Sequence, residues 1–268
     1  MTESRRLDPA ATLPTHREPG RKGNRERKQS VLISALAQVL ARRVLSGPFR
    51  GMGYLGRSPG GSTLMPKVLG TYEKEIWESI ASLLDGETPG IVVDIGAGEG
   101  YYVTGLVWSG RAARAVAYEA DDGRRDLLAQ LAKRNNVADR VEIRGYCGPE
   151  VLVAAIDEIQ PSLLIIDVEG GEVGLLDGPV VERLAKTNLV VEIHPWVNAD
   201  AGAILRQRFA STHDVAVIPA RVPVPADIRS LPFRWLASLH PRIAKRLLQE
   251  RPEGMSWLVI RSRSAGQS

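Results

Sequence analysis

The chain has 268 residues, of which 44% are hydrophobic and 25% charged, and its formal net charge is +4. A chain of this length and composition forms one large globular domain, or one domain with additions, and has enough apolar residues for a sizeable core. Its single cysteine, Cys147, excludes an intramolecular disulfide and a cysteine-rich zinc site, and we expect a cytoplasmic protein.

The first 30 residues carry much of the positive charge. They hold eight basic and four acidic residues, are rich in proline and glycine, and lack apolar periodicity. Such a segment can contact phosphates, but no aromatic residues alternate with its charges, as single-strand binding would require. We therefore predict a disordered, solvated basic tail over residues 1–30 and expect no nucleic-acid partner.

Residues 31–90 are predicted to form an extension of helices and loops before the main domain. The apolar stretch from Val31 to Leu45 is predicted to be an amphipathic helix, because it is shorter than the roughly 20 residues of a membrane span and contains two arginines. A glycine-rich loop follows over residues 47–61, and a helix over residues 71–84. Because no apolar segment reaches the roughly 20 residues of a membrane span, we expect no membrane span, and we find no apolar signal-peptide core near the first residue.

The stretch from Ile91 to Gly100, Ile-Val-Val-Asp-Ile-Gly-Ala-Gly-Glu-Gly, is the most informative part of the sequence. An apolar run that contains one acid, Asp94, predicts a buried parallel strand. Glycines at positions 96, 98 and 100 predict a turn where a bound molecule can approach the backbone without meeting a Cβ atom. Strand, turn and helix together indicate a nucleotide-type site. The alternative is an ordinary glycine-rich loop.

The glycine spacing separates two classes of cofactor. A dinucleotide-binding turn has the pattern G-x-G-x-x-G, but here Tyr101 occupies the third glycine position. The pattern Asp94-Ile-Gly-Ala-Gly-Glu-Gly instead resembles the first motif of class I methyltransferases, which use S-adenosylmethionine (SAM). The resemblance implies that SAM is bound by Asp94, Gly96, Ala97, Gly98 and Gly100.

From Ile91 onward, predicted strands and helices alternate along the chain. Strands are predicted at 91–96, 114–120, 140–145, 162–168, 188–194, 213–219 and 256–262, and helices at 100–109, 123–136, 149–159, 172–186 and 200–210. This alternation predicts an α/β, Rossmann-like fold with a seven-stranded, mostly parallel sheet and helices on both faces. We assign this domain to residues 91–268, with a basic insert at about 220–252.

Polar side chains follow three of the predicted strands, where ligands of open α/β sheets bind. Glu119 lies about 20 residues beyond the glycine turn, where an acid accepts hydrogen bonds from ribose hydroxyls. Asp167 and Glu169 face the same way if the strand predicted at 162–168 persists to them. The same holds for Glu192 and His194 in the strand predicted at 188–194. An acid inside an apolar strand is costly without a partner, which favours a functional role for Asp167 and Glu192. His194 is equally consistent with a structural histidine.

The segments Ile166-Asp-Val-Glu-Gly-Gly-Glu172, Leu175-Leu-Asp-Gly178 and Val191-Glu-Ile-His194 resemble the FkbM-type methyltransferases. These enzymes are SAM-dependent O-methyltransferases, often of sugars, polyketides and other secondary metabolites. The resemblance implies that Asp167 also contacts the cofactor and that the segment containing Tyr72 closes over it. Many class I enzymes hold the adenine with an acid after the third strand. Residues 145–148 offer none, which leaves backbone groups or Glu142 for that role.

The predicted activity is SAM-dependent methylation of a hydroxyl on a small metabolite or a sugar. Because an aliphatic hydroxyl is a poor nucleophile, we expect Asp167, Glu192 or His194 to take its proton. In a variant of this hypothesis, Mg²⁺ among the oxygens of Asp167, Glu169 and Glu192 lowers the pKa of the hydroxyl. The alternatives are a Rossmann-type NAD-dependent oxidoreductase and a non-catalytic SAM-binding protein. The sequence indicates neither the acceptor nor the oligomeric state.

Overall fold

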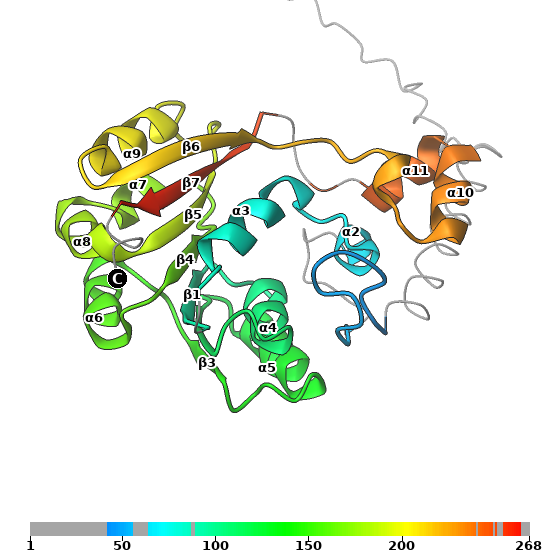
Figure 1. Cartoon of the computed structure of the whole chain (residues 1–268), viewed down its shortest axis with the longest axis horizontal. Helices are drawn as coiled ribbons and strands as arrows, with labels where there is room; N and C mark the ends of the chain where they lie inside the picture. Colours follow the sequence, from blue (N-terminus) through cyan, green and yellow to red (C-terminus); the bar gives the residue numbers. More distant parts are fainter. Residues whose placement is uncertain are drawn as a thin grey trace, which may run out of the picture.

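The computed structural model describes residues 42–55, 64–86, 89–239, 241–248, 250 and 254–263. Within them, seven strands form one sheet (Figure 1). The strands are β1 (Ile91–Ile95), β2 (Arg114–Tyr118), β3 (Val141–Arg144), β4 (Leu163–Ile166), β5 (Asn188–Ile193), β6 (His213–Pro219) and β7 (Ser256–Ser262). All seven predicted strands are therefore confirmed, although several end one or two residues earlier than predicted.

The strand order places the polar strand ends at one edge of the sheet. The order is β3-β2-β1-β4-β5-β7-β6, in which β7 is antiparallel to both of its neighbours and the other pairs are parallel. Ile95 lies level with Tyr118 and with Ile166, and Ile166 lies level with Val191. The residues that follow these four therefore meet at the carboxyl edge of the sheet. This is the class I methyltransferase fold, as the sequence predicted.

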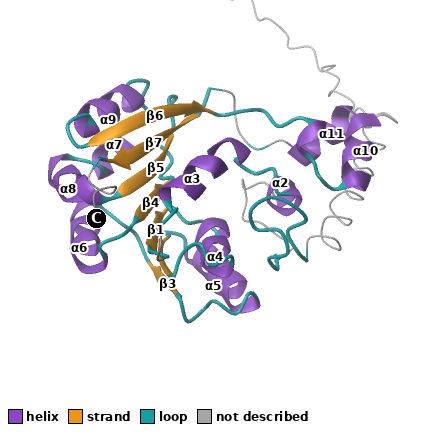
Figure 2. Cartoon of the chain, in the orientation of Figure 1, coloured by secondary structure: helices purple, strands orange, loops and turns teal. Residues whose placement is uncertain are grey.

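Helices cover both faces of the sheet, as Figure 2 shows. One face carries α3 (Trp77–Leu83), α4 (Tyr101–Trp108) and α5 (Asp122–Arg134), and the other carries α6 (Pro149–Ile159), α7 (Glu172–Leu175), α8 (Gly178–Arg183) and α9 (Ala201–Phe209). Successive strand residues point to opposite faces. Val92 accordingly packs with α4 and α5, whereas Val93 packs with α6 and α9. Two apolar cores, one on each face of the sheet, hold its carboxyl edge in place.

Three predicted helices differ from the structure. The helix predicted at 172–186 is broken, because Asp177 is extended and Gly178-Pro179 starts a new helix, which ends in the 3-10 turn η2 (Leu184–Lys186). The helix predicted at 71–84 begins only at η1 (Lys74–Ile76), since Glu73 is left-handed with φ of 47°. Of the helix predicted from Val31 to Leu45, residues 42–45 are not helical, and the rest lies outside the described residues, as does the predicted tail.

The extension and the insert pack together beside the sheet. The elements concerned are α2 (Leu64–Leu69), the 3-10 turn η3 (Pro225–Asp227), α10 (Leu231–Leu239) and α11 (Pro241–Leu248). Met65 and Leu69 of α2 join Phe233 and Leu247 in a third apolar core, so the insert lies against α2 (Figure 1). The boundaries of tail, extension and main domain stay predictions.

No helix among the described residues has the length and apolar character that crossing a bilayer requires.

Candidate functional site

The glycine turn after β1 leaves open space above its second glycine. Gly96, Gly98 and Gly100 all have positive φ, at 86°, 56° and 84°. A Cβ atom at Gly96 would lie 1.7 Å from the carbonyl oxygen of Asp167, and one at Gly100 would lie 2.5 Å from Leu128. A Cβ at Gly98 would meet no atom of the described residues within 4 Å, apart from those of its chain neighbours. The first and third glycines therefore serve packing, whereas the second faces space that a ligand can occupy.

Glu119, directly after β2, is fixed beside this turn. Its Oε2 accepts a hydrogen bond of 2.8 Å from the backbone N–H of Gly98, and its Oε1 accepts one of 2.9 Å from that of Asp121. A carboxylate has about four acceptor sites, so two of them are left for further donors. The predicted ribose-binding acid is therefore oriented by the same turn that it would serve.

Asp94, inside β1, is the most unusual carboxyl group of the site. It is buried, and its Oδ2 has no hydrogen-bond partner among the described residues. Burial raises its pKa well above the ordinary value, and the nearby carboxylates of Asp167, Glu73 and Glu119 raise the pKa further, against a smaller opposing effect of Lys67. A buried acceptor without a donor, surrounded by negative charge, is a site for a cationic or hydrogen-donating ligand.

The extension holds the glycine turn from above through Glu99, which lies between the second and third glycines. Glu99 is buried, and its Oε1 accepts hydrogen bonds from Lys67 Nζ at 2.5 Å and from the Tyr54 hydroxyl at 2.6 Å. The Lys67 ammonium also lies 4.7 Å from the ring centre of Tyr72, which in turn packs edge-on against Tyr101. Tyr72 therefore lies beside the turn. Neither Lys67 nor Tyr54 was predicted from the sequence, although an acid between two glycines, Glu99, indicated that a partner was needed.

His194 is at the centre of the second group of candidate residues. Its Nδ1 lies 2.7 Å from Oε1 of Glu172, and its Nε2 lies 3.6 Å from Oδ1 of Asp167 and 3.4 Å from Oε2 of Glu169. Burial lowers the pKa of His194, but the hydrogen bond to Glu172 and the surrounding carboxylates outweigh burial, so the pKa is raised. Three ligand atoms, one each from Asp167, Glu192 and His194, lie within 4.8 Å of one another. The structure thus brings all the predicted catalytic residues together.

For Asp167 and Glu169, strand alternation does not explain this convergence, because the predicted persistence of the fourth strand to these residues does not occur. β4 ends at Ile166, before Asp167, and Glu169 is left-handed with φ of 53°. The loop after β4 turns both carboxylates toward His194, which directly follows β5. Glu172, in the first turn of α7, is buried and accepts the backbone N–H of Gly170 at 2.9 Å as well.

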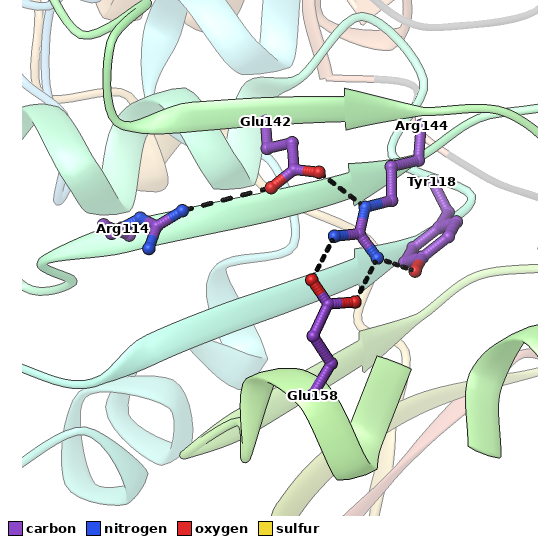
Figure 3. Close-up of polar contacts among 5 residues, drawn as sticks. All are labelled: Arg114, Tyr118, Glu142, Arg144 and Glu158. Atoms are coloured by element: carbon purple, nitrogen blue, oxygen red, sulfur yellow. Dashed lines mark hydrogen bonds and ion pairs between the residues drawn. The ribbon is translucent and has the colours of Figure 1, made fainter. Parts of the chain in front are cut away.

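Glu142, the acid considered from the sequence for the adenine, is paired with two arginines. It lies within β3, where Arg144 donates to its Oε1 at 2.7 Å and Arg114 lies 4.0 Å from its Oε2 (Figure 3). Arg144 also binds both oxygens of Glu158 and the hydroxyl of Tyr118. The ion pairs hold Glu142 along the edge strand β3.

No protein-family model and no curated protein matches the chain in sequence. Several solved structures resemble it. A precorrin-6y C5,15-methyltransferase from Geobacter metallireducens is 16% identical over 70% of this chain and 87% of that chain, with a TM-score of 0.47. An O-methyltransferase from Thermotoga maritima is 15% identical over 69% and 64%, with a TM-score of 0.44. The B. subtilis m1A22 tRNA methyltransferase is 14% identical over 69% and 65%, with a TM-score of 0.40. At these sequence identities and TM-scores, the likeness concerns the fold alone.

Proposed function

We propose that this chain transfers a methyl group from SAM to a hydroxyl of a small molecule. The observation that carries the proposal is the acidic surrounding of the open glycine turn. Asp94 lies buried beside it, and the carboxylates of Asp167, Glu73 and Glu119 all act on Asp94, while Lys67 is paired with Glu99. SAM has a cationic sulfonium and an ammonium group, which such a site attracts. The pyrophosphate of NAD carries negative charge, which the same carboxylates repel.

The cofactor would be held by the turn and by the acids around it. Glu119 accepts hydrogen bonds from the ribose hydroxyls, and Asp94 and Asp167 face the positively charged methionine end. The backbone of the turn, with Tyr72 beside it, surrounds the methionine end through Gly96, Ala97, Gly98 and Gly100. When bound, SAM supplies an activated methyl group, so this chain has to position the acceptor and remove its proton.

The acceptor side of the proposed site combines proton acceptors with an exposed apolar surface. The ligand atoms of Asp167, Glu192 and His194 lie within 4.8 Å of one another, and this group would accept the proton of the acceptor hydroxyl. Trp196 is 54% exposed, and its ring stands edge-on to that of His194 at 5.3 Å, with exposed Val197 beside it in sequence. An aromatic face next to hydrogen-bond acceptors suits a neutral hydroxylated molecule with an apolar face, such as a sugar or a secondary metabolite. The clustered carboxylates disfavour a nucleic-acid acceptor, whose phosphates they would repel.

Titration calorimetry of the full chain tests the cofactor first. We expect S-adenosylhomocysteine, the demethylated product, to bind and NADH not to bind. Glu119→Ala removes hydrogen bonds to the ribose, so affinity should fall roughly 10- to 100-fold. The matched control Glu182→Ala changes an exposed acid on α8 and should have no effect. Binding of NADH alone would indicate the oxidoreductase instead.

Turnover distinguishes an enzyme from a non-catalytic SAM-binding protein. Release of S-adenosylhomocysteine is measured with sugars, polyols, phenols and tRNA as acceptors. With the acceptor that reacts, His194→Gln should lower kcat about 100-fold or more, because the acceptor proton is no longer removed. The affinity of the His194→Gln variant for S-adenosylhomocysteine should stay within a few-fold of the wild-type value. Cofactor binding without methylation of any acceptor would favour the non-catalytic interpretation, and methylation of tRNA would contradict the small-molecule acceptor.

A further inference from the structure

The ends of β4 and β5 bring together donor atoms of the kinds that metal ions bind. Because Ile166 lies level with Val191, the next residues, Asp167 and Glu192, lie side by side. His194 follows two residues later, and the three ligand atoms lie within 4.8 Å of one another. His194 and Glu192 are buried, whereas Asp167 is partly exposed, which gives an ion a path from solvent.

The imidazole nitrogen that faces this group makes no hydrogen bond among the described residues. His194 is 2% exposed, and its Nε2 lies 3.6 Å from Asp167 Oδ1 and 3.4 Å from Glu169 Oε2. Hydrogen bonds from N–H to oxygen are about 2.7–3.2 Å long, so both distances exceed that range. Two ligand atoms that are each about 2.1 Å from one metal ion lie roughly 3.0–3.4 Å apart. The 3.6 Å between His194 Nε2 and Asp167 Oδ1 is closer to the spacing of two metal ligands than to that of a hydrogen-bonded pair.

Glu172 fixes the imidazole in the orientation that metal ligation needs. Its Oε1 lies 2.7 Å from His194 Nδ1 and also accepts the backbone N–H of Gly170. A buried carboxylate on Nδ1 favours the proton there, so the lone pair of Nε2 points toward Asp167. Metal-binding histidines almost always donate their other N–H to such a partner. This contact is independent of the acidic residues that Nε2 faces.

We infer that Asp167, Glu192 and His194 bind a divalent first-row metal ion, with Glu172 orienting the histidine. A donor set of one imidazole and two carboxylates suits Mn²⁺, Fe²⁺, Co²⁺ or Zn²⁺ better than Ca²⁺. This set differs from the Mg²⁺ site predicted from sequence, because His194 takes the place of Glu169. Glu169 is largely exposed, and its carboxylate lies outside the group of three.

The consequence for catalysis rests on the proposed function, whereas the metal site itself does not. An ion at this position would lower the pKa of an acceptor hydroxyl that binds it, so that a weak base suffices to remove the proton. Glu169 lies at the exposed side of the group and would take that proton to solvent.

The test uses the full chain, stripped with a chelator and titrated with MnCl₂ alone. Calorimetry and the loss of the free Mn²⁺ signal in electron paramagnetic resonance should give one saturable ion per chain. Asp167→Asn removes a ligand, and Glu172→Gln removes the orienting carboxylate, so each should weaken binding roughly 10- to 100-fold. The matched control Glu169→Gln should change affinity less than about three-fold. Circular dichroism confirms that each variant is folded, and Asp167→Asn replaces a partly exposed residue by one of equal size.

A local readout shows where the ion binds. The Trp196 ring lies 5.3 Å from the His194 ring, so Co²⁺ at the proposed site should quench its fluorescence. Trp196→Phe should abolish most of that quenching without changing the calorimetric affinity. The absence of saturable Mn²⁺ binding, or equal affinity of the wild type and Asp167→Asn, would overturn the inference and leave His194 as a direct base. Binding of S-adenosylhomocysteine by the stripped protein is measured in parallel, because its loss would count against the methyltransferase and not against the metal site.

Discussion

The contact between Lys67 and Glu99 allows the strongest prediction, because it joins the extension to the glycine turn. Their side chains are only 5% and 4% exposed. Lys67→Met keeps the length of the chain and removes the charge, so Glu99 stays buried without its cation. Removing one partner of a buried ion pair typically costs about 3–5 kcal/mol.

The pKa of Glu99 gives a second measure of the same contact. Burial raises this pKa, but the charge and hydrogen bond of Lys67 and the hydrogen bond of Tyr54 outweigh burial and lower it from 4.5 to about 2. At about 1.4 kcal/mol per pKa unit, the difference corresponds to about 3 kcal/mol of stabilisation of the charged form. With a cost of about 3–5 kcal/mol, we expect Lys67→Met to lower the melting temperature by about 10 °C.

Urea denaturation and calorimetry with S-adenosylhomocysteine test both consequences of this change. The free energy of unfolding should fall by about 3–5 kcal/mol, and cofactor affinity should fall more than about ten-fold, because the turn loses its anchor. Lys133→Met, on the exposed side of α5, is the matched control and should cost less than about 0.5 kcal/mol. Adding Glu99→Gln to Lys67→Met should restore most of the stability. If Lys67→Met costs no more than Lys133→Met, the reasoning is refuted.

Three further predictions concern the same edge of the sheet. Gly96→Ala should lower the free energy of unfolding by at least about 3 kcal/mol, because the new Cβ would overlap the carbonyl oxygen of Asp167. Gly98→Ala should lower it by only about 1–2 kcal/mol but should weaken S-adenosylhomocysteine binding more than about ten-fold. Equal effects of the two variants on the free energy of unfolding would contradict the packing argument. Because the pKa of Glu99 is lowered on folding, its stabilisation is present above about pH 4.5 and is lost as the pH falls toward 2, so denaturation measured at several pH values should show a decline in this window that Glu99→Gln flattens. Trp196→Ala should raise the KM for the acceptor up to about ten-fold while kcat and the melting temperature change little, and an unchanged KM would remove Trp196 from the acceptor site.

The sequence by itself determined the sheet and the position of the glycine turn. Apolar runs bounded by glycine and polar residues are local patterns, so all seven strands were found within two residues of their ends. The glycine spacing, with Tyr101 where a dinucleotide turn has its third glycine, likewise depends only on neighbouring residues. Two predicted helix boundaries differ from the structure, because Glu73 adopts a left-handed backbone conformation and a new helix begins at Gly178-Pro179.

Only the tertiary structure decided which polar groups are partners. Lys67 meets Glu99 across 32 residues of chain, and Glu172 meets His194 across 22. Neither pair has a sequence signature, because each depends on how α2 lies over the turn and how the loop after β4 bends. The same is true of the insert, whose Phe233 packs against α2. Local periodicity determines where strands form, but the burial of a charge is determined by packing between distant elements, and so only the assembled fold shows which residues complete the site.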